Sequence, residues 1–140
     1  MIRAISLVAF VFALGACASD EPQRSDDPFD MLGGRYQGAS LERALTEAAK
    51  HPLGSERNPV RADMPRGQQA YLGRLRCADG KAPTFGRNGN LGFGAFGSIV
   101  DAYDVKCQGS SPAQTTIIMD MYFPDYVETQ PVQGFSIVTS

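Results

Sequence analysis

The N-terminal segment constrains this chain most, because it sets which residues belong to the fold. Arg3 is followed by a run over residues 4–14 in which Ser6 is the only polar residue. A helix that crosses a bilayer needs about 20 apolar residues, so the run is too short to span one. A basic start, a short apolar run and small residues after it are typical of a signal peptide. We therefore expect residues 1–16 to be cleaved on export; a short anchor or a buried helix is the alternative.

The apolar run ends in Leu14-Gly15-Ala16-Cys17. This tetrapeptide resembles the lipobox of bacterial lipoproteins. The resemblance implies transfer of diacylglycerol to the Cys17 thiol, cleavage before Cys17 and acylation of the new amino terminus. Several acyl chains hold a protein firmly where a single chain binds only reversibly. No aspartate follows Cys17, which in the sorting rule of enteric bacteria favours the outer membrane, facing the periplasm.

Lipidation of Cys17 would leave two cysteines, Cys77 and Cys107, thirty residues apart. The periplasm is oxidising, so such a pair is most simply a disulfide. The alternative is a redox-active pair, which usually has Cys-x-x-Cys spacing and a lowered thiol pKa. We predict a structural disulfide.

Residues 18–39 are polar and acidic and contain proline and glycine, which is the composition of a linker. With Cys17 they form the predicted lipid anchor and flexible tether, residues 17–39. A single α+β domain is then expected over residues 40–140, in line with the length of the chain. The net charge of the whole chain is −2, which gives no reason to expect a nucleic acid as partner.

One helix is predicted, from Ser40 to Lys50. Ser40 is a suitable N-cap, and Pro52 stops the helix. The apolar residues recur at helical spacing and form one face: Leu41, Ala44, Leu45, Ala48 and Ala49.

The remaining pattern favours β structure. Longer strands are predicted at 68–77, 98–107 and 115–123. The last of these is expected to be central in the sheet, because it is apolar on both faces. Shorter strands are predicted at 82–85 and 134–139, and a glycine-rich loop at 86–97. Short strands joined by turns predict an α+β fold. We expect a small antiparallel β-sheet or half-open barrel of about five strands, with one N-terminal helix and one disulfide.

Three features are candidates for a catalytic or cofactor site. Residues 92–97 match G-x-G-x-x-G, but a strand pattern rather than a helix follows, so a plain loop is favoured over a nucleotide site. His51 is the single histidine and is expected to cap the preceding helix. Asp120 lies in an apolar strand and could form a carboxylate pair with Asp101 or Asp104, but an ion pair with a strand arginine is favoured. No cofactor and no metal site is predicted.

Charge is distributed unevenly along the chain. Residues 52–90 carry a net charge of +4, and residues 91–140 carry −4. The two segments are expected to pair across strands. The alternative is a basic face for an anionic partner, since arginine binds carboxylate or phosphate through two N–H groups. The candidate anion-binding residues are Arg61, Arg74, Arg76 and Arg87, and Arg74 and Arg76 are expected to share one strand face.

These features together predict a lipid-anchored periplasmic protein of the bacterial cell envelope that acts as a non-enzymatic binding or accessory module. Its expected partners are the membrane, through lipidated Cys17, and an envelope protein or anionic envelope polymer. Residues 52–77 are similar to small bacterial lipoproteins without an assigned activity, and no functional residue is carried over from them. The alternatives are an inhibitor of a wall-degrading enzyme such as lysozyme, and a carboxylate-based hydrolase.

Overall fold

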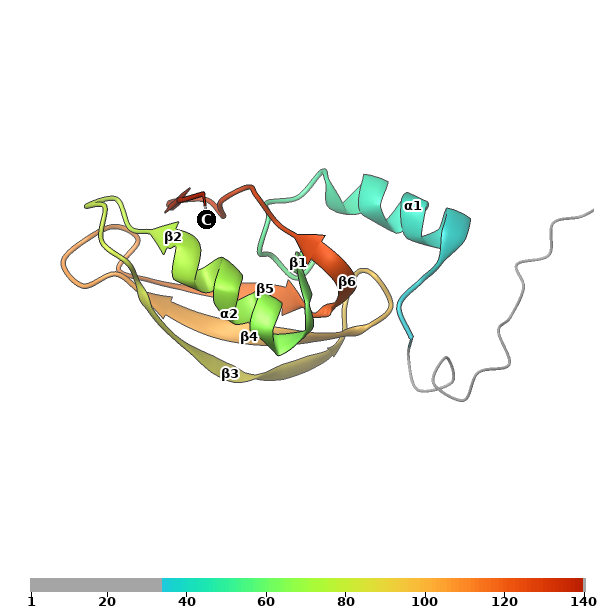
Figure 1. Ribbon diagram of the computed structural model, residues 1–140. Coiled ribbons are helices and arrows are strands. Elements are labelled where there is room, and N and C mark those ends of the chain that lie inside the picture. The colour runs from blue at the N-terminus through green and yellow to red at the C-terminus, as the bar shows by residue number, and fades with distance from the viewer. Residues whose placement is uncertain (1–33, 140) are drawn as a thin grey trace, which may run out of the picture.

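The computed structural model describes residues 34–139 (Figure 1). The predicted signal peptide, Cys17 and most of the predicted tether lie outside these residues. Within them, two helices and a five-stranded mixed sheet form an α+β fold, and Cys77 and Cys107 form a disulfide. The sheet is open and not closed into a barrel, so the predicted fold class is confirmed in its sheet form. None of the helices described is long and apolar enough to cross a membrane.

The elements follow one another in a simple order. They are α1 (Gly38–Ala48), β1 (Val60–Asp63), α2 (Met64–Arg74), β2 (Leu75–Arg76), β3 (Thr84–Phe93), β4 (Ile99–Lys106), β5 (Gln114–Asp120), β6 (Tyr122–Val127) and β7 (Ser136–Ile137). The main sheet has the order β3-β4-β5-β1-β6, and β2 pairs with β7 in a second, two-stranded sheet. Because β1 runs parallel to β5, the main sheet is mixed and not wholly antiparallel. The strand predicted as central is β5, the middle strand of the sheet.

Helix α2 occupies most of the segment for which a strand was predicted, residues 68–77, and that prediction is wrong. Its buried residues are Gln68, Tyr71 and Leu72, and Leu75 directly after it is buried as well. These positions are spaced by three, one and three residues, which is the period of a helix. The period is hidden in the sequence because Gln68 is polar. Pro65 at the start of the helix is a favourable first-turn residue.

Strand β3 replaces most of the predicted glycine-rich loop at 86–97, so that prediction is also wrong. Its pairing with β4 runs from Thr84, opposite Lys106, to Phe93, opposite Ile99, and its register shifts twice on the way. Gly92 lies in the second irregular stretch with φ of +79°. Glycine there allows a bulge in an edge strand. Glycines therefore mark bends within this strand and do not mark its end.

The helices pack against different parts of the sheet (Figure 1). Helix α2 covers one face, where Tyr71, Leu72 and Leu75 join the main core with residues of β1, β4 and β5. Helix α1 packs its predicted apolar face, including Leu45 and Ala48, against a second group around Phe96 and Phe123. The helix predicted at 40–50 is thus found two residues earlier.

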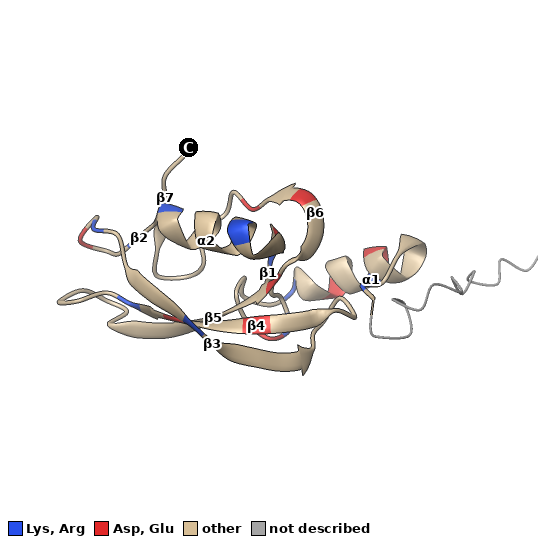
Figure 2. Ribbon diagram, turned by 60° about the horizontal axis from the view of Figure 1, so that its bottom comes forward, with Lys and Arg blue, Asp and Glu red and all other residues tan. Residues whose placement is uncertain are grey.

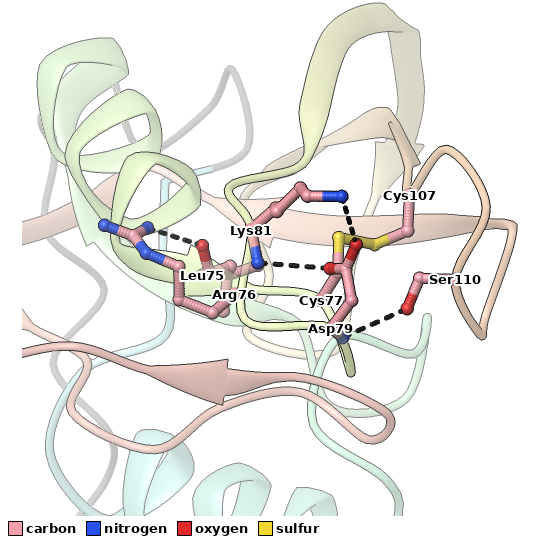
Figure 3. Close-up of a disulfide and its surroundings, with 7 residues drawn as sticks. All are labelled: Leu75, Arg76, Cys77, Asp79, Lys81, Cys107 and Ser110. Carbon is pink, nitrogen blue, oxygen red and sulfur yellow. Dashed lines mark hydrogen bonds and ion pairs between the residues drawn. A yellow bond between two sulfur atoms is a disulfide. The ribbon is translucent and has the colours of Figure 1, made fainter.

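The disulfide joins two turns at the end of the sheet away from α1 (Figures 1 and 3). Cys77 directly follows β2, and Cys107 directly follows β4. The Asp79 N–H donates to Ser110 Oγ at 3.2 Å beside the bridge. The predicted structural disulfide is confirmed.

Candidate functional site

The four candidate anion-binding arginines lie in three different settings, and positive and negative residues are interspersed over the fold (Figure 2). Arg87 of β3 forms an ion pair of 2.6 Å with Asp101 of β4, across adjacent strands. Arg76 donates to the carbonyl oxygens of Gly73 and Leu75. Arg61 and Arg74 come together at Glu128. The prediction that Arg74 and Arg76 share a strand face is wrong, because Arg74 is the last residue of α2 and Arg76 belongs to β2.

Glu128, one residue beyond β6, is the centre of this group and is buried. Its Oε1 atom accepts the backbone N–H groups of Thr129 at 2.9 Å and Gln130 at 3.0 Å. Its Oε2 atom accepts the Tyr126 hydroxyl at 3.2 Å and lies 3.8 Å from the guanidinium of Arg61. The Glu128 backbone carbonyl accepts a bond of 2.7 Å from Arg74. We refer to Arg61, Arg74, Tyr126 and Glu128 as the Glu128 cluster.

Both guanidinium groups of the cluster lie over aromatic rings. Arg61 lies 4.2 Å from the Tyr126 ring centroid and donates to its hydroxyl at 2.5 Å. Arg74 lies 5.9 Å from the ring centroid of Tyr71. Such cation–π contacts hold the groups in place at modest energetic gain. A guanidinium has five N–H donors, and each of these two uses only one in hydrogen bonds with the residues described, so donors are left for a ligand.

The Tyr126 hydroxyl is protonated at neutral pH, as tyrosine ordinarily is, and its surroundings favour that form further. Removal from water raises its pKa, and the neighbouring Glu128 carboxylate raises it further, against the opposing effect of Arg61. The hydroxyl can therefore donate to Glu128 while it accepts from Arg61. This relay fixes the distance between the two charged groups.

Two pockets lie on either side of the Glu128 cluster. The first, of about 320 Å³, lies between α2 and the end of β6; besides the cluster it is lined by Ala62, Gly67, Ala70, Tyr71 and Val127. The second, of about 460 Å³, lies on the α1 side and shares Arg61, Tyr126 and Glu128 with the first; it is also lined by Leu45, Ala49, Leu53, Asn58, Thr129 and Gln130. Both volumes are in the range of small-molecule sites. A third pocket, near Pro52 and Pro112, has no charged residue in its lining.

The candidate catalytic carboxylates lie outside these pockets. Asp120 is fully buried, and it accepts the Ser98 hydroxyl on one oxygen and the Tyr122 N–H, at 3.0 Å, on the other. The ion pair expected with a strand arginine is not formed among the residues described. Asp101 is bonded by Arg87 and, at 3.1 Å, by Gln68 of α2. Both carboxylates thus accept hydrogen bonds from other groups of the protein.

The Gln68 bond belongs to a buried network that sequence reasoning missed. Gln68 donates to Asp101 and accepts the Tyr103 hydroxyl at 3.0 Å, so that it ties α2 to β4. No local signal indicated it, because the polar Gln68 hides the helical spacing of residues 68, 71, 72 and 75.

The other two candidate features, residues 92–97 and His51, lie in a strand end and turn and at a helix end. The G-x-G-x-x-G stretch spans the end of β3 and the turn into β4, with Phe96 buried and Phe93 exposed. His51 follows α1, and its N–H donates to the Ala48 carbonyl at 2.9 Å. Residues 34–139 contain no group of three or more histidine, cysteine or acidic side chains placed to hold a metal ion.

No protein-family model, curated protein or solved structure matches the chain.

The buried carboxyl of Asp120 predicts a pH-dependent stability. Burial raises its pKa above the usual value of 3.8, against the lowering effect of the Ser98 and Tyr122 bonds. A raised folded-state pKa gives stability that is complete below 3.8 and is lost as the pH rises through the folded-state value. The Asp120→Asn variant has no carboxyl at this position, so it does not lose stability in this way as the pH rises. Urea unfolding measures the free energy of unfolding of both proteins. The value for wild type minus the value for the variant should fall as the pH rises above 3.8 and then level off. A difference that is flat or rises with pH would contradict the assignment.

Proposed function

We propose that the protein is a lipid-anchored protein of the bacterial envelope whose folded domain is a non-enzymatic binding module. In this proposal the first pocket and the Glu128 cluster receive an anionic group of an envelope partner, either a protein or an anionic polymer. The lipobox-like Leu14-Gly15-Ala16-Cys17 supports the anchor.

One observation carries the binding role: the guanidinium groups of Arg61 and Arg74 are held at one pocket by the same residue, Glu128, which is distant from both in the chain. Arg61 comes from β1 and Arg74 from the end of α2. Both are fixed by hydrogen bonds and aromatic contacts, so little side-chain freedom would be lost on binding. Guanidinium groups fixed in this way suit carboxylate or phosphate.

The setting of Asp101, Asp120 and His51 supports a binding module over a hydrolase. Asp101 and Asp120 are buried, bonded to protein groups and absent from the linings of the three pockets. A general acid or base must reach the substrate within hydrogen-bond distance. His51 also lies outside these linings.

The binding role is tested by co-sedimentation of the purified lipidated chain with two probes, lipopolysaccharide for phosphate and cell-wall sacculi for carboxylate. We expect salt-sensitive binding to one of them. Arg74→Gln should weaken it about tenfold, the equivalent of one charge-assisted contact. Arg76→Gln is the matched control, since Arg76 bonds only to nearby carbonyl groups among the residues described. Equal effects of both variants would mean that net charge, and not the pocket, drives binding; binding to neither probe would contradict an envelope-polymer ligand.

The anchor is tested in the same preparation. Cys17→Ser should leave an uncleaved precursor without acyl groups, as read by mass spectrometry of the membrane fraction. A variant that is cleaved and still bound to the membrane would refute lipidation at Cys17.

A further inference from the structure

Large exposed apolar side chains gather at one end of the main sheet. The residues described include eight large hydrophobic residues that are exposed, and five of them lie at this end. They are Tyr36, Met64, Leu91, Phe93 and Tyr122. The most exposed is Phe93, at 68%, followed by Met64, at 56%, and Leu91, at 51%. We refer to these five residues as the apolar end.

The strand register places Phe93 and Tyr122 at the same end of the sheet. Phe93 ends β3 opposite Ile99, the first residue of β4. One residue further along β4, Val100 pairs with Asp120, the last residue of β5. Tyr122 begins β6 directly after this point. Asp63, the last residue of β1, pairs with Tyr122. One end of each of the five strands of the main sheet therefore lies here.

Met64 and Tyr36 reach the same end through backbone contacts. The Met64 N–H donates at 2.9 Å to the carbonyl of Met121, which lies between β5 and β6. The Tyr36 N–H donates at 2.7 Å to the carbonyl of Phe96, in the turn between β3 and β4. The Tyr36 ring also covers Gly97, where an added Cβ would lie 2.7 Å from a ring carbon. The chain segment that leads into the domain is thus fixed against this turn.

The tether enters the domain at the apolar end. Residues 18–33 separate Cys17 from Gly34, the first residue described. A flexible chain of this length spans about 22 Å on average. The disulfide turns lie at the other end of the sheet (Figure 1). An anchor at Cys17 would therefore hold the apolar end, and not the disulfide end, close to the membrane.

We propose that the apolar end lies on the surface of the lipid bilayer, with Phe93, Leu91 and Tyr36 at the level of the headgroups. The proposal rests on lipidation of Cys17, which is itself part of the proposed function. Aromatic rings are favoured in this zone of a membrane. Arg35, whose guanidinium lies 4.7 Å from the Phe123 ring centroid, supplies a cation next to Tyr36 for lipid phosphates. Acylation would hold the protein at the membrane, and this contact would orient the domain on it.

The absence of tryptophan from the chain makes a direct test available. Phe93→Trp and the control Phe85→Trp place single indoles on the same strand, eight residues or about 25 Å apart. Phe85 pairs with Val105 near the disulfide end. Each lipidated full-length variant is placed in vesicles of phosphatidylethanolamine and phosphatidylglycerol whose acyl chains carry bromine, a quencher of indole fluorescence.

We expect the F93W indole to lose fluorescence in brominated vesicles relative to vesicles of the same lipids without bromine, and to emit further to the blue than the F85W indole. The F85W indole should not be quenched. Equal quenching of the two indoles, or of neither, would overturn the proposal. A blue shift of F93W without quenching would also overturn it, because a protein partner or a second copy would then cover this end. If F93W does not fold, as judged by urea unfolding, Leu91→Trp replaces it.

Mass spectrometry of the same samples tests the acyl anchor separately from the orientation of the apolar end. A chain without acyl groups on Cys17 would refute the anchor, and with it the basis of this orientation. A lipidated chain whose F93W indole is not quenched would refute the orientation alone and leave the anchor and the Glu128 cluster unaffected.

Discussion

Replacing Cys77 and Cys107 together with alanine is expected to lower the free energy of unfolding by about 3–4 kcal/mol. The bridge joins residues thirty positions apart, so it removes a large loop from the freedom of the unfolded chain. A small domain has a total stability of about 5–15 kcal/mol, so this loss is a substantial share of it. The measurement is urea unfolding followed by circular dichroism, where the midpoint should move to lower urea.

The double replacement with alanine suits this site because both cysteines are buried. Serine would add buried hydroxyl groups, and a single replacement would leave a free thiol. The turns at the bridge also have backbone bonds of their own, from Cys77 to the Lys81 carbonyl and from Cys107 to the Ala113 carbonyl. We therefore expect the alanine variant to keep the native fold. Reduced wild type is the control and should match it. A loss below about 1 kcal/mol would mean that the unfolded chain is already restricted in this loop.

The sequence predicted best where local chemistry decides the structure. Helix α1 has a continuous apolar face and a proline beyond its end, and it lies within two residues of the prediction. The disulfide followed from the number of cysteines and the expected compartment. The strands β4 and β5 are rich in apolar and β-branched residues, and the predicted strands overlap them closely. In these segments, propensity, period and tertiary packing all agree.

The sequence predicted poorly where tertiary contacts override the local pattern. Gln68 is polar and yet fully buried, because Asp101 and Tyr103 satisfy its amide, so the apolar period of α2 could not be seen. Strand β3 is exposed along most of its length and rich in glycine, so it lacks the apolar alternation of a strand, and its pairing with β4 decides its structure. Propensity is a weak prior in such segments.

The candidate site was predicted only in part for a related reason. Arg61 and Arg74 were named as anion-binding candidates, but Glu128 and Tyr126, which bring them together, were not. Arg61 and Tyr126 are 65 positions apart in the chain, and their contact depends on β1 pairing with β6. Nothing in the local sequence indicates that pairing, since both strands are short and β6 contains Pro124.

Glu128→Ala is expected to lower the free energy of unfolding by about 3 kcal/mol. The substitution leaves the Thr129 and Gln130 N–H groups without their acceptor and Arg61 without its carboxylate. Breaking a buried ion pair costs about 3–5 kcal/mol, and the lower end applies here because the Arg61 side chain is 25% exposed. Urea unfolding gives the stability, and binding of the probe that wild type sediments with gives the state of the first pocket.

Two further variants show whether the carboxylate itself, or only its shape, organises the pocket. Glu128→Gln keeps one oxygen that can accept the two N–H groups, so it should cost only about 1–2 kcal/mol. It removes the charge that holds Arg61, so probe binding should still change. Glu47→Ala is the matched control, since Glu47 pairs with Lys50 at the exposed surface of α1, where ion pairs contribute little. If Glu128→Ala were no more destabilising than Glu47→Ala, the Glu128 carboxylate would not be the group that holds Arg61, and the proposed binding site would lose that part of its structural basis. Arg74 bonds to the Glu128 backbone carbonyl, which the variant keeps.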